Sequence, residues 1–362
     1  MKTLRQVNIE GFKSIAKQTL DLGDLNVVIG PNGSGKSNLI GVFRLLDRVL
    51  SRNLQLYVAE QGGADRFLHH GQKHTPAMEV NFDFAQNAYG FRLKPALGDS
   101  LVFETESVAY HGRWNYAEVI AQGHSESKLE QAAKEGKNQV PAYVYPQIAN
   151  WVVYHFHDTS DSAPSKRTCD IADNRFLRPD AANLAAYLYW LRERHATEYG
   201  HIVEHVRLMA PFFDDFLLEP SRVNPDKIKL EWRQEGSDAY FDAYSLSDGT
   251  LRFICLATLL LQPTHSMPTL ILLDEPELGL HPAAIRLLAE MLEAAAQSRQ
   301  VLLATQSVTL LNQFEPEHVI VAENDGRATT FNRIDELVPN LLSPELHQLY
   351  LRSATPVPNM EM

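Results

Sequence analysis

The chain has 362 residues, 44% of them hydrophobic and 22% charged, which is the composition of a globular protein with a sizeable core. Its formal net charge of -12 argues against a protein built mainly to coat nucleic acid. The charge gives no support to DNA or RNA binding, although it does not exclude a local basic groove on a dimer. The sequence has no run of eighteen apolar residues, no apolar leader and no cysteine pair at metal spacing, so we expect a cytoplasmic protein without a membrane segment.

The first 94 residues predict the N-terminal lobe of an α/β fold. Val7 and Ile9 alternate with polar neighbours, as in a half-buried strand, and residues 25–29 form an apolar run that predicts a buried strand. Apolar residues at helical spacing predict a helix over 39–50. Further strands are expected at 78–84 and 90–93, which gives this lobe a mixed β character.

Residues 95–235 predict a mostly helical insertion, or lid. Glycines, lysines and glutamates crowd 124–139, which indicates an exposed loop or a solvated helix. Pro179-Asp180 precedes a helical stripe, so Asp180 is the predicted N-cap. A second helix is expected near 202–209.

The last third returns to alternating strands and helices. We predict a buried helix within 246–261, a strand at 269–273, a helix at 282–297 and strands at 301–304 and 318–322. This alternation favours a largely parallel core sheet covered on both faces. We assign residues 236–340 to the C-terminal lobe and 341–362 to a tail.

A phosphate-binding loop begins where the buried strand 25–29 ends. Residues 30–37 match G-x-x-x-x-G-K-[ST] at every fixed position, between an apolar strand and an amphipathic helix. Backbone N–H groups of such a loop surround phosphate oxygens, Lys36 adds a positive charge, and Ser37 offers a hydroxyl to Mg²⁺. No Asn-Lys-x-Asp segment for reading guanine is present, which favours ATP over GTP. The predicted ATP-binding residues of this segment are Gly30, Asn32, Gly33, Ser34, Gly35, Lys36, Ser37 and Asn38.

Two acids follow the apolar strand near residue 270. A buried strand carries its last side chains to the edge of the sheet, so Asp274 and Glu275 are expected beside the phosphate loop. Asp274 is the predicted Mg²⁺ ligand, directly or through water, together with Ser37. Glu275 is predicted to polarise the attacking water.

The run Leu246-Ser247-Asp248-Gly249-Thr250 resembles the Leu-Ser-Gly-Gly-Gln signature of ABC ATPases and precedes the acidic pair by about twenty-five residues. In that family the signature binds the γ-phosphate held by the other subunit. The resemblance therefore implies that Ser247 and Gly249 bind ATP across a head-to-tail homodimer.

Other positions are similar to the same family. Residues 276–282 stand where its D-loop lies, with His281 in place of an Asp, and Gln306 stands where the switch histidine would be. Gln306 could hydrogen-bond the γ-phosphate or its water but cannot carry charge. Gln72 resembles the Q-loop residue of SMC ATPases, which implies contact with the metal or the attacking water. Lys13 resembles the basic residue that SMC-like ATPases place near the phosphates.

Together, residues 1–335 resemble the predicted ATPases of the RecF/SMC-like branch, of the AAA-21 or AAA-15 type. The 175 or so residues between Gln72 and Ser247 hold no sustained heptads, so the resemblance implies a compact lid without a coiled-coil arm. It implies ATP and Mg²⁺ as cofactors. It also implies a role in DNA repair or phage defence beside a separate effector protein.

The sequence and the resemblance leave three functions open. The leading one is an ATP-hydrolysing switch that dimerises around two Mg-ATP. The second is a nucleotide-binding scaffold with little turnover, which Gln306 keeps open. The third is a nuclease of the overcoming-lysogenization-defect (OLD) type, disfavoured because about fifty-five residues after Ser307 are too few for its Toprim domain. The segment 151–159 also resembles the RecF/SMC-like ATPases. For its polar residues His155, His157 and Asp158, we favour packing or hydrogen bonding over metal binding.

Overall fold

The computed structural model describes residues 4–112 and 115–334, so the predicted tail and the end of the C-terminal lobe lie outside the described residues. The chain divides into two compact units. Of the described residues, the first contains 4–112, 115–151, 304–308 and 314–334, and the second contains 152–303 and 309–313.

An antiparallel sheet dominates the first unit. Its strand order is β2-β1-β4-β5-β6-β7. The strands are β1 (Gln6–Phe12), β2 (Ile15–Asp21), β4 (Met78–Asp83), β5 (Asn87–Ala96), β6 (Ser100–Tyr110) and β7 (Tyr116–Ala121). Ile9 of β1 lies opposite Val80 of β4, and both are buried. The alternation predicted from Val7 and Ile9 is confirmed, because one face of this sheet is core.

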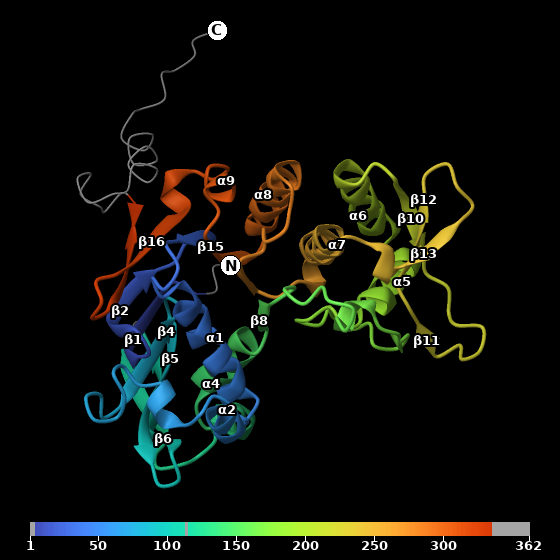
Figure 1. The fold of residues 1–362 in the computed structure, drawn as a ribbon. Coiled ribbons are helices and arrows are strands. Elements are labelled where there is room, and N and C mark those ends of the chain that lie inside the picture. Colours follow the sequence, from blue (N-terminus) through green and yellow to red (C-terminus); the bar gives the residue numbers. More distant parts are fainter. Residues whose placement is uncertain (1–3, 113–114, 335–362) are drawn as a thin grey trace. The chain divides into compact units, whose positions relative to one another are not determined.

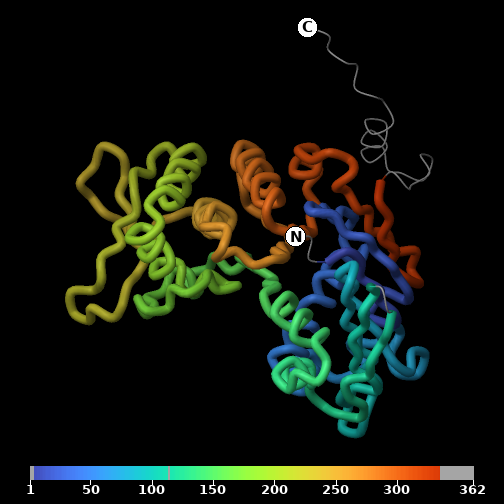
Figure 2. The backbone as a smooth tube through the Cα atoms, turned by 180° about the vertical axis from the view of Figure 1, so that it is seen from behind, coloured from blue at the N-terminus to red at the C-terminus, as the bar shows by residue number. Residues whose placement is uncertain are grey.

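A second set of strands in the first unit carries the phosphate loop. β3 (Leu25–Ile29) is buried along its whole length and pairs in parallel with β16 (Val319–Asn324). β16 pairs antiparallel with β17 (Thr329–Arg333). The helices of this unit are α1 (Lys36–Leu50), α2 (Leu54–Glu60), α3 (Leu129–Glu135) and α4 (Gln139–Ile148). In Figures 1 and 2, α1, α2 and α4 lie on one side of β4, β5 and β6.

Helix α7 is the core of the second unit. The helices of this unit are α5 (Leu184–Arg194), α6 (Ala196–Met209), α7 (Asp248–Leu261) and α8 (Pro282–Ala296). Every residue of α7 from Thr250 to Leu260 is buried, because α6 and α8 both pack against it (Figure 1). Such an all-round apolar helix needs cover on each side.

Three groups of strands complete the second unit. β15 (Gln300–Thr305), β14 (Leu270–Asp274) and β8 (Trp151–Tyr154) are neighbours in that order. β10 (Phe213–Leu217), β12 (Glu231–Gln234) and β13 (Tyr240–Asp242) form a small antiparallel sheet. β9 (Cys169–Asp170) pairs with β11 (Lys227–Ile228). The last residues of β15 belong to the first unit, and α9 (Val308–Leu311) follows it.

The predicted insertion coincides with neither unit. Its beginning, from residue 95 to Trp151, clusters with the first unit, where β6 and β7 extend the antiparallel sheet. The rest lies in the second unit and contains short strands as well as α5 and α6. The segment is therefore partly helical, with short strands as well as helices, and the α/β fold class is confirmed.

The predicted start of α5 was also wrong. The helix begins at Leu184 with Asn183 at the N-cap, whereas Asp180 accepts a hydrogen bond from the backbone N–H of Ala182 at 3.0 Å. Ala181 lies between them with a φ of 55°. A left-handed residue cannot continue into a right-handed helix, so the chain turns once more before α5 begins.

Candidate nucleotide-binding site

The phosphate loop leaves β3 at Ile29 and enters α1 at Lys36. Gly33 and Gly35 have φ values of 79° and 98°, in the left-handed region where glycine alone is unstrained. Gly35 is the N-cap of α1 and offers no side chain to its first N–H groups. These donors and the positive end of the helix dipole are arranged as an anion-binding site requires.

The loop has no room for side chains at two of its glycines. A Cβ on Gly30 would lie 2.3 Å from the carbonyl oxygen of Ala322. A Cβ on Gly35 would lie 2.3 Å from Oγ1 of Thr329 and 2.9 Å from Oγ of Ser14. The backbone thus packs directly against β16, β17 and the turn between β1 and β2.

Ser14 and Thr329 support the loop from outside the motif. The Ser14 Oγ accepts hydrogen bonds of 2.7 Å from Nδ2 of Asn38 and of 2.7 Å from Oγ1 of Thr329. Sequence reasoning missed both supports, since each lies far from the motif along the chain. The one sequence signal was the neighbouring Lys13, which drew attention to this turn.

The residues of the loop fit the phosphates of a nucleotide. Nζ of Lys36 is buried and donates to the carbonyl oxygens of Gly30, at 2.6 Å, and Pro31, at 3.0 Å. Within the described residues, the buried Oγ of Ser34 has no hydrogen-bond partner. A buried hydroxyl without a partner is costly, and a phosphate oxygen would satisfy it. Ser37, the predicted metal ligand of the loop, is exposed.

We expect Gly35→Ala to weaken ATP binding by about a hundredfold or more, equivalent to about 3 kcal/mol. The added Cβ would overlap Thr329 at a residue that already has positive φ. Fluorescence titration with a labelled ATP analogue measures the change. Gly136→Ala is the matched control, since Gly136 has a φ of 67° and nothing within 4 Å of its Cβ position. Equal affinities in the two variants would contradict the prediction.

Three predicted residues lie apart from the contacts just described. Nζ of Lys13 lies 5.5 Å and 5.8 Å from the ring centroids of Phe12 and Phe67, and 3.8 Å from the Cβ position of Gly41 in α1. Burial lowers the pKa of Lys13, and the charge of Arg44 lowers it further. Gln72 is exposed in a loop and donates its backbone N–H to Asp65 at 2.8 Å, and Gln306 is exposed after β15. Their roles toward ATP stay predictions.

The two predicted acids lie in the second unit. Asp274 ends β14 and Glu275 follows it, both half-buried. Glu275 has a φ of 45°, a strained backbone for a residue with a side chain. Such strain clusters at functional sites, where the surrounding structure holds it. The strand and this turn together fix the direction in which both carboxylates leave the sheet.

The signature segment begins α7 in the same unit. Ser247 is the exposed N-cap, and its Oγ accepts a hydrogen bond of 3.1 Å from the backbone N–H of Thr250. A Cβ on Gly249 would lie 2.5 Å from the carbonyl oxygen of Gly279 in the predicted D-loop. The start of the helix and the D-loop therefore touch through their backbones.

Arg252 connects this helix to the segment after β8. Its Nε donates to the carbonyl oxygen of Phe156 at 2.9 Å and its Nη2 to that of His157 at 3.1 Å. A small cavity lies here. Its lining residues are Tyr154, Phe156, His157, Arg252, Leu256, Leu273, Asp274, Glu275 and Pro276. Partial burial lowers the pKa of His157, against which the charges of Asp274 and Glu275 raise it.

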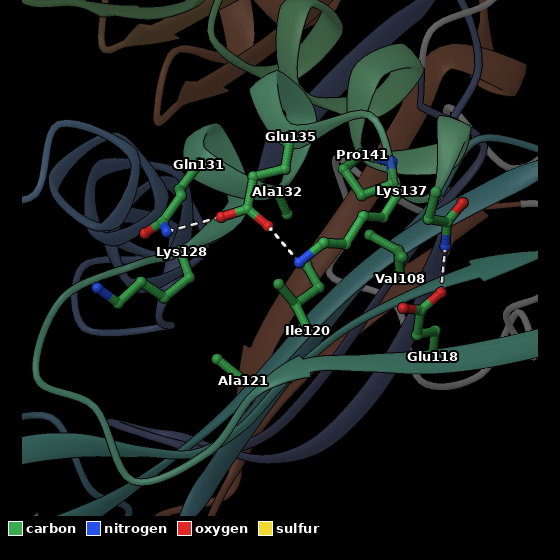
Figure 3. A pocket seen from close by; sticks show the side chains of 11 residues that line it. Val108, Glu118, Ile120, Ala121, Lys128, Gln131, Ala132, Glu135, Lys137 and Pro141 are labelled. Atoms are coloured by element: carbon green, nitrogen blue, oxygen red, sulfur yellow. Dashed lines mark hydrogen bonds and ion pairs between the residues drawn. The ribbon is translucent and has the colours of Figure 1, made fainter.

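The remaining cavities and side-chain clusters of the described residues give no second candidate site. Between β7 and helices α3 and α4 lies a cavity of about 450 Å³, where Glu135 contacts Gln131 and Lys137 (Figure 3). None of the predicted site residues lines it. No three His, Cys, Asp or Glu side chains in residues 4–112 and 115–334 gather as a metal site. Over the same ranges, no helix is both long and apolar enough to cross a membrane.

Solved structures identify the class of fold. An SMC head bound to the C-terminal winged-helix domain of ScpA is similar with a TM-score of 0.59 at 14% identity, over 91% of this chain and 97% of that one. An SMC head from Pyrococcus furiosus with an extended coiled coil, bound to the C-terminal domain of ScpA, gives a TM-score of 0.57 at 13% identity, over 98% and 100%. The chain has the fold of an SMC-type ATPase head.

A family model places the chain more narrowly. The model described as "AAA domain, putative AbiEii toxin, Type IV TA system" matches residues 25–312, and the chain belongs to this family of ATP-binding, ABC- and SMC-like ATPases. The energy-coupling factor transporter ATP-binding protein EcfA2 of Halalkalibacterium halodurans is 31% identical over 125 residues, 32% of this chain and 43% of that protein. The Old nuclease of Escherichia phage P2 is 36% identical over 91 residues, 24% of this chain and 15% of the nuclease. The chain thus spans less than half of either relative.

Proposed function

We propose that this chain is an ATP-hydrolysing switch that closes as a head-to-tail homodimer around two Mg-ATP. One observation carries the nucleotide part of the proposal: a helix-entering glycine loop with left-handed Gly33 and Gly35 and no space for a Cβ at Gly30 or Gly35. Membership of an ATPase family supports hydrolysis as the reaction.

In this mechanism the chain positions groups and stabilises charge, without a covalent intermediate. The N–H groups of residues 30–37 hold the phosphates, and Lys36 exchanges its carbonyl partners for phosphate oxygens. Ser37 and Asp274 would hold Mg²⁺. Glu275 orients the attacking water and accepts its proton. Bound Mg-ATP supplies the γ-phosphoryl group that is transferred to water.

The dimer is proposed from Ser247. This residue begins α7 at an exposed position, with a glycine two residues later packed on Gly279. A serine-capped helix start presents several donors to an anion, so a second copy can offer its phosphates here. Each chain then carries half of each site.

The switch is proposed to act on a separate effector, in DNA repair or phage defence. The family description, which refers to a toxin of a type IV TA system, supports a defence role, and the ScpA-bound SMC heads support control through a partner protein. The alternative is a nucleotide-binding scaffold with little turnover. The uncharged Gln306 at the switch position favours it, and a turnover assay separates the two.

A dilution series tests the proposal. Because each site needs two chains, the rate of ATP hydrolysis per chain is expected to rise with protein concentration and then reach a plateau. Steady-state phosphate release measured from nanomolar to micromolar protein gives this curve. Full activity in a monomer would refute the dimer, and bound ATP without hydrolysis at any concentration would favour the scaffold.

A further inference from the structure

The segment after β8 places a histidine against the acidic pair of β14. His157 lines the same small cavity as Asp274 and Glu275, although 117 residues of chain separate it from Asp274. Burial lowers the pKa of His157, and the negative charges of Asp274 first and of Glu275 second act against that lowering. The side chain keeps exposed surface, so it lies at the rim of the cavity.

The backbone of this segment is held rigidly. The guanidinium of Arg252, buried in the first turns of α7, donates to two successive carbonyl oxygens, those of Phe156 and His157. Upstream, the backbone N–H of His155 donates to the carbonyl oxygen of Pro179 at 3.1 Å. The backbone at His157 is therefore anchored to α7.

The imidazole of His157 is available for a new hydrogen bond. Within the described residues, neither ring nitrogen makes a hydrogen bond, whereas the Arg252 guanidinium in the same cavity is engaged by the two carbonyls. A ring nitrogen of a neutral histidine can donate to a carboxylate. Glu275, on a strained backbone, needs its carboxylate fixed in one direction if it is to orient water.

We propose that His157 is a positioning residue for ATP hydrolysis, whose imidazole turns to donate to the carboxylate of Glu275 when Mg-ATP is bound and then holds it in the orientation that activates water. This inference rests on the proposed function. His157 is proposed to act through Glu275 and not by touching the nucleotide.

The test compares His157→Ala with His155→Ala, a matched exposed histidine two residues earlier that does not line the cavity. We expect His157→Ala to lower kcat by about tenfold to a hundredfold, as when a residue that orients a catalytic side chain is removed, with the Kd of a labelled ATP analogue within about twofold. His157→Asn, which keeps an N–H donor, should recover part of the rate. His155→Ala should resemble the wild type in both measurements.

A double-mutant cycle tests the route through Glu275. In a Glu275→Gln background, adding His157→Ala should not slow single-turnover hydrolysis further, because the group being positioned is already altered. An equal loss in both backgrounds, or an unchanged kcat in His157→Ala, would overturn the inference. A wild-type protein that binds ATP without hydrolysing it would instead refute the proposed function, and this inference with it.

Discussion

Glu275→Gln is expected to lower the steady-state rate of ATP hydrolysis by about a thousandfold, while ATP still binds and an ATP-bound dimer accumulates. Glutamine keeps the size and one oxygen of the side chain but cannot accept the proton of the attacking water. The strained backbone at Glu275, with a φ of 45°, is no worse for glutamine than for glutamate, so the fold should be unaffected. Phosphate release measures the rate, and size-exclusion chromatography with light scattering, with and without ATP, measures the dimer.

The matched control is Glu290→Gln, which makes the same chemical change at an exposed position of α8. It should keep the wild-type rate and show only the transient dimer of the wild type. Full turnover in Glu275→Gln would contradict the assignment of Glu275. Loss of turnover without an accumulated dimer would keep Glu275 in its role and argue against the switch.

Motifs that are local in sequence could be predicted well. The strand 25–29, the helix after it and the strand before Asp274 were all found, because each shows its periodicity within one window and is bounded by a glycine or an acid. The phosphate loop was found for the same reason. Its geometry follows from the strand before it and the helix after it.

Strands that lack a regular alternation of buried apolar and exposed polar residues were missed. β7 has no buried residue among Tyr116 to Ala121, so no alternation marks it. In β6, the fully buried Glu106 accepts hydrogen bonds from Tyr89 at 2.7 Å, from the backbone N–H of Lys128 at 2.8 Å and from Ser127. Burial would raise the pKa of Glu106, but hydrogen bonds from His124 and these groups outweigh it and lower the pKa. A buried carboxylate whose hydrogen-bond donors lie elsewhere in the chain interrupts the hydrophobic pattern by which a strand is predicted.

Contacts between residues that lie far apart in the sequence could not be predicted either. Ser14 and Thr329 meet at the phosphate loop from positions 315 residues apart. In the sequence, His157 stands out only as a neighbour of His155 and Asp158. In the structure, it lines a cavity together with Asp274 and Glu275. Single-residue contacts of this kind leave no spacing in the sequence, because the fold alone brings them together.

Ser247→Arg is expected to lower turnover by about a hundredfold or more and to leave ATP affinity within about twofold. In the proposed dimer Ser247 serves the site of the other chain, so a bulky side chain there disables that one site and leaves the phosphate loop of its own chain untouched. Loss of the N-cap adds about 1 kcal/mol of destabilisation, which a thermal melt will detect and which is too small to unfold the chain. Unchanged turnover would argue against a shared site.

Mixing two inactive variants decides whether the sites are shared. Ser247→Arg and Glu275→Gln are combined in equal amounts before ATP is added, so that subunits exchange freely. A mixed dimer has one site with both defects and one site with neither. Half of the random pairs are mixed and each has one intact site, so about a quarter of the wild-type rate should return. If both residues served the site of their own chain, every site in the mixture would carry one defect and no activity would reappear, whatever the rate of subunit exchange.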